Sequence, residues 1–182
     1  MKKVSFILVM AFLAVVGFTS RPQAVASPAP AATAVPIVKP DLSSMKFLAG
    51  TWTCHSQLRG NDRPDTSTTT VELSGQWLVS HDVAPPFDKY RTRAINTSTY
   101  VGFDNNARRW VTLGVDDLGG YSVSTSPGWN GNTLVWTDKL VQGDTVGVTT
   151  LTKMSDAQYS FVNVFKNSKG SSQTQKGNCK KS

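Results

Sequence analysis

The sequence predicts an all-β protein, folded as an antiparallel up-and-down barrel of about eight to ten strands with a short N-terminal helical turn. Residues from Asp41 to Ser182 include 18 Thr, 16 Ser and 13 Val, which suit strands and turns better than helices. Short alternating runs are separated by turn residues throughout this region. The longest connection, from Pro85 to Arg93, is too short for an obvious crossover.

Ten runs have the alternation of strands that bury one face. They are Thr51–Arg59, Thr66–Leu73, Gln76–Ala84, Thr97–Phe103, Arg108–Val115, Tyr121–Thr125, Thr133–Thr137, Thr145–Thr152, Tyr159–Phe165 and Ser171–Cys179. Turn signals lie between them at Asp104–Asn106, Asp117–Gly120, Pro127–Asn132, Gln142–Asp144 and Asn167–Gly170. A meander of this length exposes long sheet edges if it stays flat, so we expect a closed barrel, with a sandwich as the alternative.

A helical turn is expected before the first strand, between Asp41 and Leu48. Asp41 can cap this turn, because its carboxylate can accept a bond from the free backbone amides of the first turn. The spacing then places Leu42, Met45 and either Phe47 or Leu48 toward the barrel.

Residues 1–26 resemble a secretory leader. Lys2 and Lys3 precede an apolar run from Phe6 to Phe18, and Ala24–Ala26 supplies a small-residue cleavage pattern. The apolar run is shorter than the roughly 20 residues that span a bilayer. We therefore expect cleavage near Ala26, no permanent membrane span after cleavage, and a secreted, periplasmic protein.

Residues 27–40 are rich in Pro and Ala and are expected to form a disordered linker, so that 41–182 is the barrel domain. The net charge of +7 suggests a nucleic-acid partner at first. Removing Lys2, Lys3 and Arg21 with the leader takes away three of these charges and leaves +4. A secreted chain with this modest charge is not expected to bind nucleic acid.

The two cysteines, Cys54 and Cys179, fall in the first and last predicted strands. These strands are neighbours in a closed up-and-down barrel, and an even cysteine count in a secreted chain favours a disulfide. Two unpaired thiols are the alternative. The chain has no CxxC and no Cys/His cluster, so neither a metal site nor a catalytic cysteine is predicted.

Several short motifs carry a family resemblance. They are Gly50-Thr51-Trp52 after Phe47–Ala49, Gly102-Phe103-Asp104, Gly128-Trp129-Asn130-Gly131, Leu134-Val135-Trp136 and Cys179-Lys180. Together they resemble secreted bacterial lipocalin-like domains of unknown function, within the calycin superfamily. The resemblance implies a barrel whose Trp52 packs over the closed end. Nitrobindin-type haem barrels share the Gly-Thr-Trp motif, but they bind iron through a late His, and no His follows His81. No cofactor is predicted.

Aromatic residues spread over the predicted strands are the candidate ligand contacts. Alternation in Gln76–Ala84 places Trp77 and His81 on the apolar face of their strand, which we interpret as the interior. The residues predicted to contact a ligand are Trp77, His81, Tyr100, Trp110, Trp136 and Phe161. The alternatives are that these side chains fill the barrel completely and that His81 is a hydrogen-bonded core residue.

The connection after the strand that bears His81 combines two aromatic and three basic residues. These are Phe87, Lys89, Tyr90, Arg91 and Arg93. One interpretation is a flap at the barrel mouth, whose cations meet the anionic head group of an amphipathic ligand. The other is a solvated loop.

No catalytic motif is present: the chain lacks HExxH, GxSxG, a P-loop and a dinucleotide-binding glycine pattern. We therefore expect a non-catalytic protein that binds a small apolar or amphipathic ligand inside the barrel. An envelope protein that binds a partner through its barrel-mouth loops is the alternative. A barrel-type isomerase or cyclase, or a haem-binding protein, is a weaker one. The sequence carries no signal for an oligomeric state.

Overall fold

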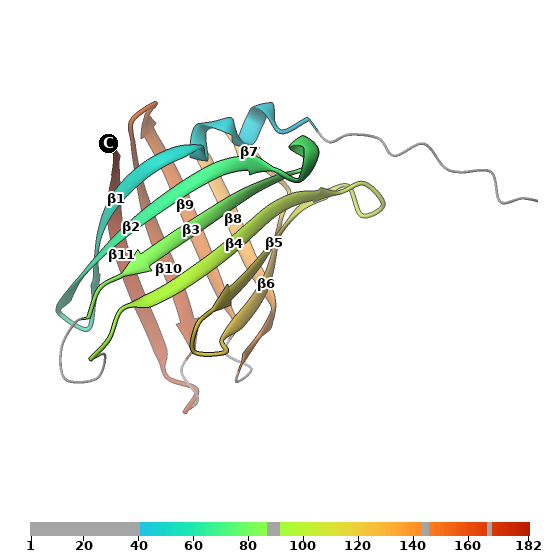
Figure 1. Ribbon diagram of the computed structural model, residues 1–182. Helices are drawn as coiled ribbons and strands as arrows, with labels where there is room; N and C mark the ends of the chain where they lie inside the picture. The colour runs from blue at the N-terminus through green and yellow to red at the C-terminus, as the bar shows by residue number, and fades with distance from the viewer. Residues whose placement is uncertain (1–40, 87–91, 143–145, 167–168) are drawn as a thin grey trace, which may run out of the picture. The chain divides into compact units, whose positions relative to one another are not determined.

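Ten strands close into an antiparallel up-and-down barrel within the part of the chain that the computed structural model describes (Figure 1). The described residues are 41–86, 92–142, 146–166 and 169–182, and all of them belong to one compact unit. The predicted fold class is confirmed. The predicted leader and linker, residues 1–40, lie outside the described residues.

The strands follow one another along the chain with short connections. Their bounds are β1 (Gly50–Leu58), β2 (Asn61–Glu72), β3 (Trp77–Ala84), β4 (Ile95–Asp104), β5 (Arg109–Asp116), β6 (Tyr121–Ser126), β7 (Trp129–Asn130), β8 (Thr133–Val141), β9 (Gly147–Ser155), β10 (Gln158–Lys166) and β11 (Ser172–Lys181). Two 3-10 turns accompany them, η1 (Ser43–Leu48) and η2 (Leu73–Gly75).

Two pairings between strands that are not consecutive along the chain complete the ring. β1 pairs with β11, and β6 pairs with β8, while every other strand pairs with its neighbour along the chain. The β6–β8 ladder is irregular between Val123 and Ser124. An irregularity of this kind bends a strand and increases its twist, which helps a sheet close on itself. The two-residue β7 pairs only with the start of β8.

A disulfide joins Cys54 to Cys179, as the sequence predicts. The two residues lie directly opposite each other in the β1–β11 ladder, with their Cα atoms 4.1 Å apart. Both side chains are buried against Trp52 in a small internal cluster. The bond therefore links the first strand to the last one across 125 positions of sequence.

Most predicted strand ends differ from the observed ones by a few residues, as in β8, which runs to Val141 and not to Thr137, and two differences have a clear structural basis. The turn predicted at Pro127–Asn132 contains the short strand β7. β2 begins at Asn61 rather than Thr66, because residues 59 and 60 form a tight turn in which both φ angles are positive. This turn geometry matches the twist of a hairpin and lets the ladder start at once. Pro64 is tolerated there because residues 61–65 pair with β1 on one side only.

The turn η1 closes one end of the barrel, where it lies across the strand ends in Figure 1. Leu42 and Met45 are buried in the main core cluster, as predicted from their spacing. The Asp41 carboxylate accepts bonds from the amide and the hydroxyl of Ser43, at 2.8 and 2.9 Å. These bonds stabilise the charged form and lower the pKa of Asp41.

The barrel interior changes from apolar to polar with distance from η1. Leu78, at the η1 end of β3, is fully buried in the same cluster as Met45, Trp110 and Trp136. The next inward residues on β3 are Ser80 and then Asp82. The interior therefore has an apolar end below η1 and a polar middle, and the candidate site lies where they meet.

Candidate functional site

A cavity of about 360 Å³ lies inside the barrel. Its lining comes from every strand of the ring except β11, and from η1. The lining residues are Leu48, Trp52, Ser67, Thr69, Leu78, Ser80, Asp82, Thr99, Val101, Thr112, Ser124, Trp136, Thr149 and Tyr159. Half of them are Ser or Thr. Because these side chains are small, the interior of the ten-stranded ring is not filled.

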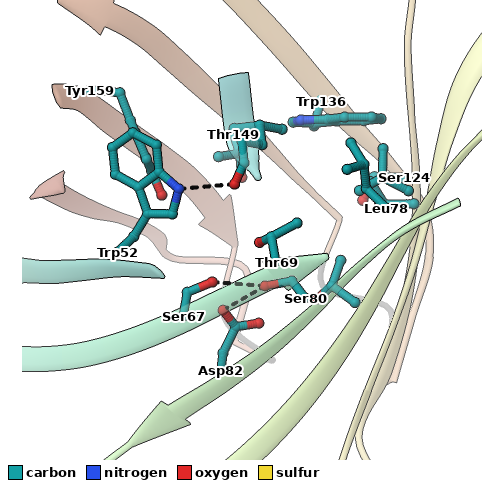
Figure 2. Close-up of a pocket in the computed structure, with 14 residues that line it drawn as sticks. Trp52, Ser67, Thr69, Leu78, Ser80, Asp82, Ser124, Trp136, Thr149 and Tyr159 are labelled. Carbon is teal, nitrogen blue, oxygen red and sulfur yellow. Dashed lines mark hydrogen bonds between the residues drawn. The ribbon is translucent and has the colours of Figure 1, made fainter. Parts of the chain in front are cut away.

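The apolar wall of the cavity is built around Trp52, which is 1% exposed. Its indole Nε1 donates a hydrogen bond of 2.9 Å to the carbonyl of Leu48. Its ring meets those of Phe47 and Tyr159 edge to face, with centroids 5.2 and 4.8 Å away. This packing ties β1 and β10 to η1. Trp136 adds a second indole to the lining (Figure 2).

A chain of hydrogen bonds forms the polar wall (Figure 2). The hydroxyls of Ser67 and Ser80 lie 2.7 Å apart, and Ser80 donates to Asp82 Oδ1 at 3.1 Å. Because each hydroxyl has one proton and Ser80 gives its own to Asp82, Ser67 is the donor in the bond to Ser80. The three residues come from the adjacent strands β2 and β3, whose inward positions bring them together.

Burial raises the pKa of Asp82, because a charged carboxylate loses its hydration inside the barrel. The hydroxyls of Ser67 and Ser80 and the nearby His81 act in the opposite direction but do not cancel this effect. Burial also raises the pKa of Tyr159, and the charges of Asp82 and Asp65 raise it further. The phenol therefore stays protonated, and it shares one region of negative potential with these carboxylates.

Replacing Asp82 with Asn is expected to stabilise the fold at neutral pH. A carboxyl group whose pKa is raised by folding favours the folded state while it is protonated, and this contribution is lost as the pH rises through the folded-state pKa. The amide has no charge to desolvate, so the melting temperature of the Asp82→Asn variant should exceed that of the wild type at neutral pH. Thermal unfolding across a pH series tests this: the difference should shrink in acid. A variant that melts lower than the wild type at every pH would contradict the assignment.

Two other carboxylates of the barrel serve the fold. Asp138 accepts bonds from the Ser124 hydroxyl at 2.6 Å and from the Gly147 amide at 2.8 Å, and so connects β6, β8 and β9. Asp116 accepts from the amides of Leu118 and Gly120 in the β5–β6 turn. Backbone amides donate to the carboxylates of Asp138 and Asp116. The bond to Asp82 described above comes from a hydroxyl group instead.

Three of the six predicted ligand contacts point inward. Trp136 lines the cavity. Trp110 is buried in the main core, edge to face with Phe103. Phe161 packs against the Trp52 and disulfide cluster and covers Gly177, where an added Cβ would lie 2.5 Å from the ring. Trp110 and Phe161 thus belong to the packed interior next to the cavity.

The other three residues, Trp77, His81 and Tyr100, lie on the outer face of the barrel, so their predicted inward orientation was wrong. Trp77 and Tyr100 line a shallow surface hollow together with Leu73 and Leu113. The Trp77 ring lies over Gly102, which has no side chain in the way. His81 is exposed, and its Nδ1 is 3.1 Å from the Ser98 hydroxyl.

The error arose because the wrong face of β3 was interpreted as the inward one. Alternation separates two sets of residues on a strand, and the more apolar set was interpreted as inward. In this barrel the inward set of β3 is Leu78, Ser80 and Asp82, because the interior of the middle section is lined by hydroxyl groups. Polarity alone did not identify the buried face.

Of the five residues of the predicted mouth loop, Arg93 is among the described residues. Phe87, Lys89, Tyr90 and Arg91 lie outside the described residues. Arg93 is described, and its guanidinium donates to the carboxylate of Asp117 at 2.9 Å and to the Asp117 carbonyl at 3.1 Å. The Asp117 carboxylate in the β5–β6 turn therefore balances the charge of Arg93. Hydrogen bonds from Asn96 and Arg93 lower the pKa of Asp117.

The sequence interpretation missed Asp82 and the Ser and Thr residues of the lining. A signal for the latter was present in the alternation Ser67-x-Thr69 of β2, opposite Ser80-x-Asp82 of β3. Polar residues at alternate positions on two adjacent strands indicate that one face of the sheet is polar there. Only the pairing of the strands shows that this face is inside.

Across residues 41–182, apart from the undescribed gaps, no group of three or more His, Cys, Asp or Glu side chains is placed to hold a metal ion. Within the same residues no helix is long and apolar enough to cross a membrane.

The fold and the site together define a closed antiparallel barrel with an internal, partly polar cavity. Scans of the chain against protein-family models and against curated proteins find no match. Among solved structures the chain is similar to a redesigned β-barrel, b11L5F_LGL, at 15% identity and a TM-score of 0.44, over 76% of this chain and 95% of that one. It is also similar to EF1p2_mFAP2b bound to DFHBI, at 13% identity and a TM-score of 0.41, over 76% and 97%. Similarity at this level carries no argument about function.

Proposed function

We propose that the protein binds a small amphipathic molecule inside the barrel and does no chemistry on it. The observation that carries the proposal is the cavity of about 360 Å³ within a closed ring of strands. This volume falls within the range of small-molecule sites, which extends from roughly 300 to 1,000 Å³. Small-molecule sites combine apolar walls with a few placed polar groups, and this cavity has both.

The two walls suggest how such a ligand lies. Trp52, Leu78 and Trp136 offer flat or branched apolar surface to its apolar end. Ser67, Ser80 and Asp82 offer donors and acceptors to its polar end. A rigid barrel presents these groups without reorganisation, which lowers the entropic cost of binding.

We further propose that the chain acts outside the cytoplasm, as a secreted or periplasmic protein released from its leader near Ala26. The Cys54–Cys179 disulfide supports this, because such bonds persist in oxidising compartments. A relationship to the lipocalin-like secreted domains stays part of this proposal, supported by the Gly50-Thr51-Trp52 motif beside η1. Mass spectrometry of the protein from its native host would test secretion and cleavage near Ala26, since a mature chain that retains residues 1–26 contradicts both.

Filling the cavity tests the binding function. Thr112 lines the cavity, whereas its neighbour Leu113 lies on the outer face of the same strand. We expect the wild-type protein to bind the neutral fluorophore phenylnaphthylamine with enhanced emission. Thr112→Phe should weaken this binding by about tenfold or more, because the ring occupies the ligand's space.

Leu113→Phe is the matched control, and it should bind the fluorophore as the wild type does. Circular dichroism establishes that both variants are folded. Equal affinity in all three proteins would place the fluorophore outside the cavity and contradict the proposal. Absence of binding to the wild type would also count against it.

A second candidate function, a barrel-type isomerase or cyclase, is favoured by one observation. Asp82 is a carboxyl group beside a cavity, with a pKa raised by burial, as a general acid requires. Unchanged phenylnaphthylamine binding to Asp82→Asn would show that the carboxyl group is not needed to hold an apolar body. Conversion of a bound molecule to a new product by the wild type, but not by this variant, would establish the enzyme.

A further inference from the structure

Asp82 is the one residue of the cavity lining that has a carboxyl group. The other ionisable group of the lining is Tyr159, which stays a neutral phenol. No Lys, Arg or His contributes to the lining among the described residues. Any net charge of the lining is therefore negative.

The Asp82 carboxylate has acceptor capacity beyond its contact with Ser80. An ionised carboxylate offers about four lone-pair sites on two oxygens. The Ser80 hydroxyl, which itself bonds to Ser67, uses one of these sites. A ligand donor that reaches Asp82 would form a charge-assisted bond, which is about twice as strong as a neutral one.

Aromatic rings lie on the same cavity. Trp52, Trp136 and Tyr159 all contribute to its lining. The face of an aromatic ring attracts a cation, and this attraction is strongest for indole and grows when the pair is shielded from water. Indole rings together with one half-buried carboxyl group form a favourable environment for an organic ammonium group.

Two basic side chains that lie beside η1 are engaged outside the cavity. Lys153 pairs with Asp156 at 2.6 Å and lies over the Phe47 ring. Lys181 lies over the Trp52 ring and donates to the Phe47 carbonyl at 3.4 Å. Both lie beside η1 and outside the cavity lining, so neither is placed to neutralise a ligand anion next to Asp82.

We infer that the cavity selects organic amines in their protonated form, and that Asp82 is the specificity-determining residue. This inference rests on the proposed binding function. The apolar body of the amine lies against Trp52 and Trp136, and its ammonium group faces Asp82 and the two serines. An anionic amphiphile is excluded by like charge, which reverses the sequence-based expectation of an anionic head group.

Three probes with one ring system and different polar ends separate these possibilities. Naphthylmethylamine is a cation at neutral pH, naphthylmethanol is neutral and naphthoate is an anion. Affinities are measured by displacement of phenylnaphthylamine. The wild type should bind the amine at least about tenfold more tightly than the alcohol, since a hydrogen bond to a charged group contributes this much. Naphthoate should bind more weakly than the alcohol.

Asp82→Asn should lose about tenfold or more of its affinity for the amine and keep its affinity for the alcohol within about twofold. Asp62→Asn is the matched control. It removes the same charge from an exposed site on the neighbouring strand β2, where Asp62 pairs with His55. If the control loses as much affinity for the amine as Asp82→Asn does, the effect is general electrostatics and the inference fails.

The experiment also separates failure of this inference from failure of the binding function. Equal affinity of the wild type for the amine and the alcohol overturns the role of Asp82. The binding function still stands in that case if Thr112→Phe abolishes both. If no probe of the series binds, phenylnaphthylamine included, the binding function itself is contradicted.

Discussion

Replacing both Cys54 and Cys179 with Ala is expected to lower the free energy of unfolding by about 5 kcal/mol. The disulfide closes a loop of 125 positions, and chain entropy assigns about this value to a loop of that length. The effect is large because the bond joins the first strand to the last, and so restricts almost the whole domain in its unfolded state. Urea unfolding measures it, with a lower midpoint expected for the variant.

Reducing agent provides the control for this prediction. A reductant should shift the unfolding midpoint of the wild type toward that of the double variant and leave the double variant unchanged. A double variant as stable as the oxidised wild type would mean that the β1–β11 ladder alone holds the ring closed. The bond would then be incidental to stability.

Trp52→Ala is expected to lower the free energy of unfolding by about 3–5 kcal/mol, the usual cost of removing a large buried aromatic side chain. The ring is 1% exposed, contacts Phe47 and Tyr159, and donates to the Leu48 carbonyl. Its loss would leave a cavity beneath η1 and release the turn from the barrel. Thermal and urea unfolding both measure the change.

Two variants divide this effect into its parts. Trp52→Phe keeps most of the ring packing but removes the bond to Leu48, and should cost about 1 kcal/mol for that bond, plus the smaller ring volume. Trp77→Ala removes an indole from the outer face, where part of the ring stays in solvent, and should cost less than about 2 kcal/mol. A loss at Trp77 equal to that at Trp52 would contradict the inside and outside assignments.

The strand pattern could be predicted because it depends on local features. Alternation and turn residues along the chain placed all ten strands of the ring, with errors mainly at their ends. β2 was shortened in the prediction because Asn61 to Asp65 are poor strand residues, although the tight turn at Arg59 and Gly60 holds them in the ladder. β7 was missed because two residues carry no periodicity.

The candidate site was harder to predict because it depends on which face of each strand is enclosed. Trp136 was placed correctly in the lining, while Trp77, His81 and Tyr100 were assigned to the wrong side. Asp82 was overlooked because it lies on the face of its strand that was interpreted as outward, whereas its polar neighbours surround it inside the barrel. Those neighbours, Ser67 and Ser80, are known only once β2 is paired with β3.

By itself the sequence determined a secondary structure of short antiparallel strands, and it predicted the partner of each cysteine. Both follow from chain order, since adjacent strands pair and the first meets the last when the sheet closes. The tertiary structure alone decided that small hydroxyl side chains on adjacent strands face inward and leave about 360 Å³ unfilled beside Asp82. The volume and charge of a cavity are properties of residues from many strands, and alternation along any one strand is the same whichever face is enclosed.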